Sequence, residues 1–240
     1  MDGRGEVLQN VTISEEEREE VRRNVRAFAR RTPLIPLPLP LRVGRKEVRI
    51  FMKLESLQPI GSFKVRGGGE AVRAFVKRQT DGTQGACLVT ASAGNMAQGM
   101  AYAAQKAGGG VRVVTVVPNT APEAKLDRVR ELGGEVVSVP MADWWQLVVS
   151  HNAEPILPDS VRQGKYGFVH PVADRSVVVG HATMAWEIVE QLQELAPDSP
   201  RVAAVVAPYG GGALVAGVAA GLRNQGPART RVYSAEVSSA

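Results

Sequence analysis

Apolar residues along the chain follow helical spacing in some stretches and strand spacing in others. Ser14 precedes Glu17 at the spacing of a capping box, and apolar residues then recur at helical intervals to about residue 30. This pattern predicts an amphipathic helix over 14–30 with a charged, solvated face. Residues 31–40, RTPLIPLPLP, contain four prolines. They therefore predict an extended segment that leads to a first strand, VRIFMKLE.

Beyond these segments, short apolar runs typical of buried strands alternate with stretches typical of helices. Such alternation is typical of parallel βαβ units, so we expect an α/β fold of two-lobed, open parallel sheets with flanking helices. The pattern is less regular from 141 to 170, where Trp144 and Trp145 are expected to pack between the lobes. Strands are expected at 86–90, 111–117, 135–139, 201–208 and 231–237, and helices at 66–79, 95–107, 122–132, 176–195 and after residue 212.

Composition narrows the class of protein. The chain has 240 residues, of which 44% are hydrophobic and 22% charged, which is ordinary for a globular protein. Its 29 Lys+Arg and 24 Asp+Glu are dispersed, so nucleic acid is not expected as a partner. No apolar run reaches the roughly 18 residues of a membrane span, and the single cysteine, Cys87, lies in an apolar run that predicts core. We expect a cytoplasmic protein with no membrane partner.

The segment QPIGSFKVRGGG, residues 58–69, presents one lysine, Lys64, between a Ser-Phe pair and a glycine run that opens a helix. No charged residue precedes Lys64 closely, so its amine is expected to face a close-packed pocket with a lowered pKa. An amine that loses its proton readily is suited to imine formation with an aldehyde cofactor.

Two further segments have the pattern of anion sites. In APYGGGALVAG, residues 207–217, glycines between a strand and a helix allow backbone amides to converge on an anion, although a plain tight turn would show the same pattern. The dinucleotide-binding fingerprint requires glycine where this chain has Val215, and the P-loop requires lysine where it has Val218, so neither motif is present in this segment. In TASAGNMAQG, residues 90–99, Asn95 opens a helix, where it can cap that helix or reach a ligand oxygen.

In this order and spacing, these segments resemble the fold-type II pyridoxal phosphate (PLP) enzymes, the group of serine and threonine dehydratases and serine racemase. The resemblance extends from RTPL at 31–34 through LESLQPIGSFKVRGG, TASAGNMAQG, FVHPVAD and APYGGGALVAG to YSAEV. It implies the tryptophan synthase β-like fold, PLP as cofactor and a small amino acid as substrate. The family also implies a homodimer.

The resemblance also implies roles for individual residues. Lys64 would be the catalytic Schiff-base lysine, Phe63 would back the cofactor ring, and Asn95 would hold its phenolic oxygen. The phosphate would lie on Gly210, Gly211, Gly212, Ala213 and Leu214, and the substrate carboxylate on Ser92, Ala93 and Gly94.

The reaction implied is β-elimination from L-threonine or L-serine, which yields a 2-oxo acid and ammonia, with Lys64 removing the α proton. A racemase or another lyase of the same fold is the alternative. Racemases of this group have a serine where this chain has Ala93, and because alanine cannot carry a proton, Ala93 favours a dehydratase. A truncated, non-catalytic PLP-binding paralogue is the third.

Several features differ from the family pattern. Met96 stands where histidine is usual, His181 and Ala182 stand in a stretch that usually reads Gly-Gln-Gly-Thr, and Ala213 replaces a fourth glycine. The Ala213 methyl is tolerable only at negative φ.

The resemblance divides the chain into a large PLP-binding domain, 1–75 and 150–240, and a small substrate-loop domain, 76–149. It predicts that a C-terminal part of the large domain, with the partner of the pyridine nitrogen, is lacking. We expect no metal site, since Glu236 is the only residue that resembles a cation ligand of some members.

Overall fold

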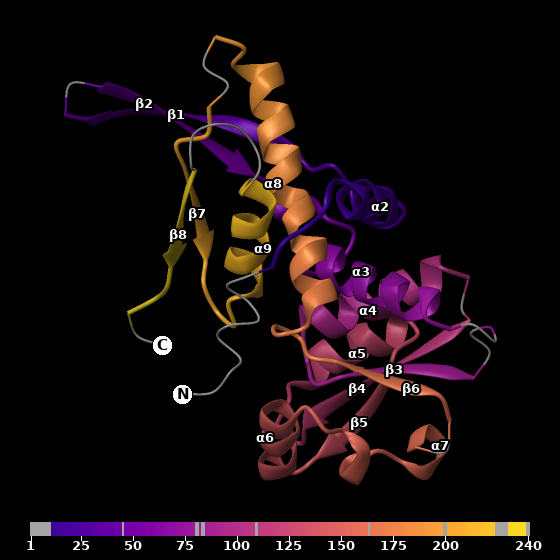
Figure 1. The fold of residues 1–240 in the computed structure, drawn as a ribbon. Coiled ribbons are helices and arrows are strands. Elements are labelled where there is room, and N and C mark those ends of the chain that lie inside the picture. The colour runs from indigo at the N-terminus through magenta and orange to yellow at the C-terminus, as the bar shows by residue number, and fades with distance from the viewer. Residues whose placement is uncertain are drawn as a thin grey trace.

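The protein has two lobes, one built on a parallel sheet and one on a long helix with short strand pairs (Figure 1). The structure is a computed structural model. It describes residues 11–44, 46–79, 82, 85–108, 110–162, 164–198, 201–223 and 230–238.

The lower lobe in Figure 1 contains four parallel strands with helices on both faces. Its strands are β3 (Ala86–Thr90), β4 (Val111–Pro118), β5 (Glu135–Val139) and β6 (Tyr166–Val169), and its helices are α3 (Lys64–Lys77), α4 (Asn95–Lys106), α5 (Glu123–Glu131), α6 (Met141–Ser150) and α7 (Asp159–Arg162). The strand order is β5-β4-β3-β6. Successive residues face opposite sides of the sheet. Leu88 and Val113 lie in one core cluster with residues of α3 and α4, whereas Val89 and Val114 lie in another with Leu147 of α6. Helices thus cover both faces, as a parallel sheet requires.

The upper lobe is organised around α8 (Arg175–Leu195), which packs against α9 (Ala213–Leu222). The indole of Trp186 on α8 donates a hydrogen bond to the carbonyl of Gly221 on α9, at 3.1 Å. Its remaining elements are α2 (Glu15–Arg26), the antiparallel pair β1 (Leu34–Val43) and β2 (Lys46–Lys53), the parallel pair β7 (Ala204–Pro208) and β8 (Arg231–Ala235), and a 3₁₀ turn (Glu55–Leu57). A second 3₁₀ turn, Glu154–Ile156, follows α6 in the lower lobe. None of the helices in the described ranges is both long and apolar enough to cross a membrane.

The first helix is shorter than its periodicity predicts. Ser14 caps α2 as expected, since its hydroxyl accepts from the backbone N–H of Glu17 at 3.2 Å. The helix ends at Arg26 rather than near residue 30. The backbone N–H and carbonyl of Arg30 instead pair with the side-chain amide of Gln58, both at 2.9 Å. A tertiary partner therefore takes the polar groups that a longer helix would have used.

The proline-rich segment forms strand β1 and pairs with β2, whereas the sequence predicted only an extended connection. The register shifts between Leu37 and Leu41, around Pro38 and Pro40. Proline has no N–H to donate, so a regular ladder cannot continue through these positions.

The stretch from 141 to 170 is more ordered than its pattern suggests. It forms α6, α7 and β6, and the last of these pairs with β3 in the sheet. The four-residue run of β6 contains Gly167, so its strand signal is weak. The predicted domain boundary at residue 150 assigns β6 to the large domain, although β6 pairs with β3 in the four-stranded sheet of the small lobe. The assignment of cofactor binding to one domain and substrate binding to the other stays a prediction.

The expectation that both tryptophans pack between the lobes was wrong. The indole of Trp144 donates to the carbonyl of Val116 within the small sheet, at 3.2 Å, and Trp145 is 60% exposed. Both lie on α6. Trp144 therefore packs against the core of the small lobe, and Trp145 lies on its surface.

Candidate active site

Lys64 is the first residue of α3, two positions earlier than the sequence predicted. Its backbone N–H donates to the hydroxyl of Ser62 at 3.3 Å, so a serine before the helix holds the start of the first turn. Phe63 occupies the cap position without a side-chain hydrogen bond. The lysine is thereby placed at the junction between the two lobes.

The amine of Lys64 lies in an apolar setting. Its Nζ is 5.4 Å from the centre of the Phe63 ring and 3.5 Å from the carbonyl of Pro171, which accepts a weak hydrogen bond. Burial lowers the pKa of Lys64 below its ordinary value. Within the described ranges no carboxylate pairs with it. The direction of this shift agrees with the lowered pKa expected from the sequence, and the residue as a whole is half-buried.

The glycine run forms the start of α9. Gly212 is the cap residue and has φ 87°, in the left-handed region that favours glycine. Ala213, the first residue of the helix, is buried and has no positive φ, so its methyl group is tolerated as the sequence required. The first N–H groups of a helix have no partner within it and carry the positive end of the helix dipole. Together with Leu214, these residues therefore form a site suited to phosphate.

The predicted substrate loop precedes α4. The N–H of Gly94 donates to the Ser92 hydroxyl at 3.3 Å, and the hydroxyl of Thr115 donates to the Ser92 carbonyl. The cap of α4 is Gly94, with no side-chain hydrogen bond, so the suggestion that Asn95 caps this helix was wrong. The side chain of Asn95 is exposed and available to a ligand. Ala93 is half-buried.

Close backbone approaches bring the three segments together. A Cβ atom on Gly99, one turn after Asn95, would come within 2.9 Å of the Lys64 carbonyl oxygen, so α4 runs against the start of α3. A Cβ on Gly211 would come within 2.3 Å of Val172, the neighbour of Pro171. Lys64, the loop before α4 and the start of α9 are therefore neighbours, whereas Glu236 follows β8 and is exposed. No group of His, Cys, Asp and Glu suited to a metal occurs in the ranges described.

Arg66 was not singled out from the sequence, although it anchors the start of α3. It is fully buried and forms paired hydrogen bonds of 2.8 to 2.9 Å with Glu55 and Glu187. Glu187 also binds Lys53 at 2.6 Å. These partners lie 11 and 121 positions from Arg66. No local signal points to them, because the pairing arises only in the folded chain.

His181 is a second residue that the sequence marked only as a departure from the family pattern. It is fully buried on α8, and neither ring nitrogen has a hydrogen-bond partner among the described residues. Burial, and then the charges of Lys64 and Arg66, hold the pKa of His181 well below its usual range. The ring is therefore neutral at physiological pH.

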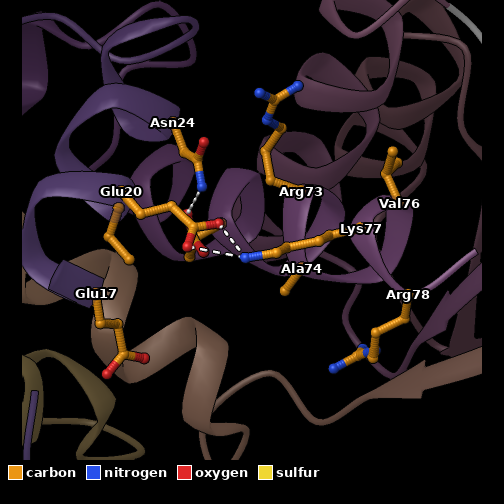
Figure 2. A pocket seen from close by; sticks show the side chains of 10 residues that line it. Glu17, Glu20, Asn24, Arg73, Ala74, Val76, Lys77 and Arg78 are labelled. Atoms are coloured by element: carbon orange, nitrogen blue, oxygen red, sulfur yellow. Dashed lines mark hydrogen bonds and ion pairs between the residues drawn. The ribbon is translucent and has the colours of Figure 1, made fainter. Parts of the chain in front are cut away.

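A cavity of about 440 Å³ lies between α2 and α3 and contains none of the predicted site residues (Figure 2). Lys77 of α3 reaches across to the carboxylate of Glu20 on α2, at 2.7 and 2.9 Å. Glu70 also lines this cavity but is only 7% exposed, and its carboxylate accepts one long hydrogen bond from Asn24, at 3.4 Å. Burial is the main cause that raises the pKa of Glu70 to about 7.

Comparison with known proteins identifies the family. The model described as "Pyridoxal-phosphate dependent enzyme" matches residues 25–240. The chain belongs to this family. Among the relatives of this PLP-dependent family, serine racemase of Rattus norvegicus is 30% identical over 222 residues, which cover 92% of this chain and 61% of the rat protein. The catabolic L-threonine dehydratase TdcB of Staphylococcus aureus (strain USA300) is 31% identical over 209 residues, which cover 87% of this chain and 54% of that protein.

The solved structures agree on the fold of this PLP-dependent protein. The T.th. threonine deaminase has a TM-score of 0.71 at 30% identity, with 93% of this chain and 65% of that chain covered. The fold is the tryptophan synthase β-like fold of PLP enzymes. The chain thus spans about half to two thirds of the length of the relatives that it matches.

The residues present fit PLP. A desolvated lysine amine suits its aldehyde, and the backbone N–H groups that begin α9 suit its phosphate. The left-handed Gly212 at this helix start has no side chain to obstruct an anion. Asn95 lies one turn from the approach of Gly99 to Lys64, with its amide exposed.

Proposed function

We propose that this chain catalyses β-elimination from L-threonine or L-serine, giving 2-oxobutanoate or pyruvate with ammonia. The α proton and the β-hydroxyl leave as water, and hydrolysis of the resulting enamine releases ammonia. The observation that supports this proposal is the desolvated amine of Lys64 beside an anion-binding helix start, within a family whose relatives include threonine dehydratase.

Each residue of the site would contribute a separate task. PLP, when bound, supplies an electron sink for negative charge at the α carbon of the amino acid. Because burial lowers its pKa, Lys64 is neutral more readily than an exposed lysine and accepts the α proton at Nζ. Phe63, whose ring centre lies 5.4 Å from this amine, would back the cofactor ring.

The anionic groups would be held by backbone and amide donors. The start of α9, Gly210 to Leu214, would hold the phosphate, and Asn95 would donate to the phenolic oxygen. Ser92, Ala93 and Gly94 would surround the substrate carboxylate, with the loop fixed by the hydrogen bond from Thr115.

Serine racemase is the second candidate, because the rat relative has this name. Racemisation requires an acid or base on the opposite face of the substrate, and Ala93 carries only a methyl group at the position where racemases have serine. Elimination is therefore the favoured proposal. The homodimer, the cytoplasmic location and the absence of nucleic-acid or membrane partners stay predictions.

The test uses the full chain with PLP. Wild-type protein should convert L-threonine to 2-oxobutanoate, and borohydride should fix a cofactor adduct on the peptide that contains Lys64. Lys64→Ala should reduce turnover by about 10²-fold or more and remove the adduct. Lys106→Ala, which alters an exposed lysine beside Tyr102, should change neither.

Three outcomes separate the readings. Retained turnover in Lys64→Ala refutes Lys64 as the catalytic base. An adduct on Lys64 with no 2-oxo acid, but with interconversion of L- and D-serine on a chiral column, favours the racemase. An absence of both adduct and product favours a non-catalytic paralogue.

A further inference from the structure

His181 occupies a position where its imidazole has no evident benefit for folding. The residue is fully buried, and both ring nitrogens lack a hydrogen-bond partner in the part of the chain described. Unpartnered polar atoms in the interior destabilise a fold, and an apolar side chain of similar volume would avoid this cost. The presence of a histidine at this position is therefore not explained by the stability of the fold.

The surroundings of His181 point to Lys64. Its ring makes an edge-to-face contact with Phe63, with centroids 5.1 Å apart and an angle of 66° between the planes. The amine of Lys64 lies over the same Phe63 ring, 5.4 Å from its centre. Edge-to-face pairs prefer a defined relative orientation of the two rings. His181 therefore restricts the ring against which the amine rests.

His181 also contacts the two helices that begin at the site. A Cβ on Gly67, one turn after Lys64, would come within 2.5 Å of the imidazole Cε1. A Cβ on Gly217 of α9 would come within 2.6 Å of the His181 Cβ. The residue is thus wedged between the helix that presents the amine and the helix whose start is suited to phosphate.

We propose that His181 is a positioning residue that fixes the Phe63 ring and, through it, the amine of Lys64. The inference rests on the proposed function only in giving Lys64 a reactive role. A neutral imidazole suits this place, because a charged one would face Lys64 from α8 while Arg66 lies nearby on α3. The Pro171 carbonyl faces the amine from the turn after β6.

The test measures the amine directly, without cofactor or turnover. Full-length protein is labelled with acetic anhydride from pH 6 to 10, and mass spectrometry of the Lys64 peptide gives the midpoint of its titration. In His181→Leu the Phe63 ring loses its edge-to-face partner, so the ring is free to turn away from the amine of Lys64 and leave it more exposed to water. The midpoint of Lys64 should therefore rise by about half a unit or more. PLP binding to this variant should weaken by about threefold or more, which is the same free-energy change.

Stability separates positioning from packing. His181→Leu removes the unpartnered nitrogens, so its midpoint of urea unfolding should equal or exceed that of wild type. Val179→Ala is the matched control, since Val179 is equally buried on α8 but belongs to a core cluster without Phe63. It should lose stability and keep the wild-type Lys64 midpoint.

A second variant covers a failure of the first to fold. His181→Gln has no aromatic edge, so it should also raise the Lys64 midpoint. Wild-type labelling midpoints in the folded variants would overturn the inference, whether or not the protein converts threonine. Absence of turnover with a shifted midpoint would instead count against the proposed reaction alone.

Discussion

Replacing Glu70 with glutamine should change how the stability of the protein depends on pH. Glu70 is only 7% exposed, and its one hydrogen bond to Asn24 is long, at 3.4 Å. Burial, with a smaller contribution from the carboxylates of Glu20 and Glu17, raises its pKa from 4.5 to about 7. The folded protein therefore holds a proton at Glu70 over a pH range in which the unfolded chain has released it.

The sign and size of the effect follow from this shift. An acid whose pKa is higher in the folded state loses stability as pH rises, beginning near 4.5 and ending just above 7. At about 1.4 kcal/mol per pKa unit the full effect is about 3 kcal/mol, of which about 2.5 kcal/mol falls between pH 5 and pH 8. Glutamine has the same shape and no titration. The advantage of Glu70→Gln over wild type should therefore grow by about 2.5 kcal/mol over this interval.

Urea unfolding followed by tryptophan fluorescence at pH 5, 6, 7 and 8 measures this difference. Glu131→Gln, at an exposed carboxylate on α5, is the control and should follow the wild-type pH dependence. A constant difference between Glu70→Gln and wild type across the four pH values would refute the reasoning, because it would mean that Glu70 titrates alike in the folded and unfolded states.

Three further predictions concern other parts of the molecule. Arg66→Met should reduce the free energy of unfolding by about 3 kcal/mol, because the largely buried Glu55 loses its cation and Glu187 keeps only Lys53; a loss below about 1 kcal/mol in urea unfolding would show that Glu55 finds another partner. Gly212→Ala should cost about 1 to 2 kcal/mol of stability, since alanine disfavours φ 87°, and should weaken PLP binding measured by absorbance. Gly210→Ala, in the same loop with open space around it, should have little effect on stability, and equal losses in the two would contradict the strain argument. Cys87, buried with a pKa raised to about 11, should resist dithionitrobenzoate until the protein is unfolded, and rapid labelling of the folded protein would contradict its burial.

The parts of the site that the sequence predicted are carried by short segments. Lys64 follows a run of uncharged residues, and its lowered pKa could be inferred from these neighbours. The negative φ required at Ala213 by its methyl group was likewise inferred from the glycine run beside it, and it is confirmed. Local signals sufficed because each feature depends on the residues beside it in the chain.

The parts that could not be predicted depend on distant partners. The pairing of Arg66 with Glu187 and the end of α2 at Arg26 are set by residues far away in sequence. The contact between His181 and Phe63 likewise joins residues far apart in the chain. Strand β6 was missed for another reason: its four residues gain their place only by pairing with β3.

The ionic cluster around Arg66 also has a consequence for synthesis of the protein on the ribosome. Arg66 emerges 121 residues before Glu187, and Lys53 emerges 134 residues before it. At about 5 to 20 residues per second, the ribosome takes several seconds or longer to supply the missing carboxylate. During that interval Arg66 has Glu55 as its carboxylate partner, but burial of the start of α3 leaves Lys53 without one and Arg66 with only half of its pairing. The nascent chain should therefore keep this helix hydrated, and a protease added to stalled chains that end before α8 should cleave near Arg66, whereas chains that extend beyond α9 should be protected.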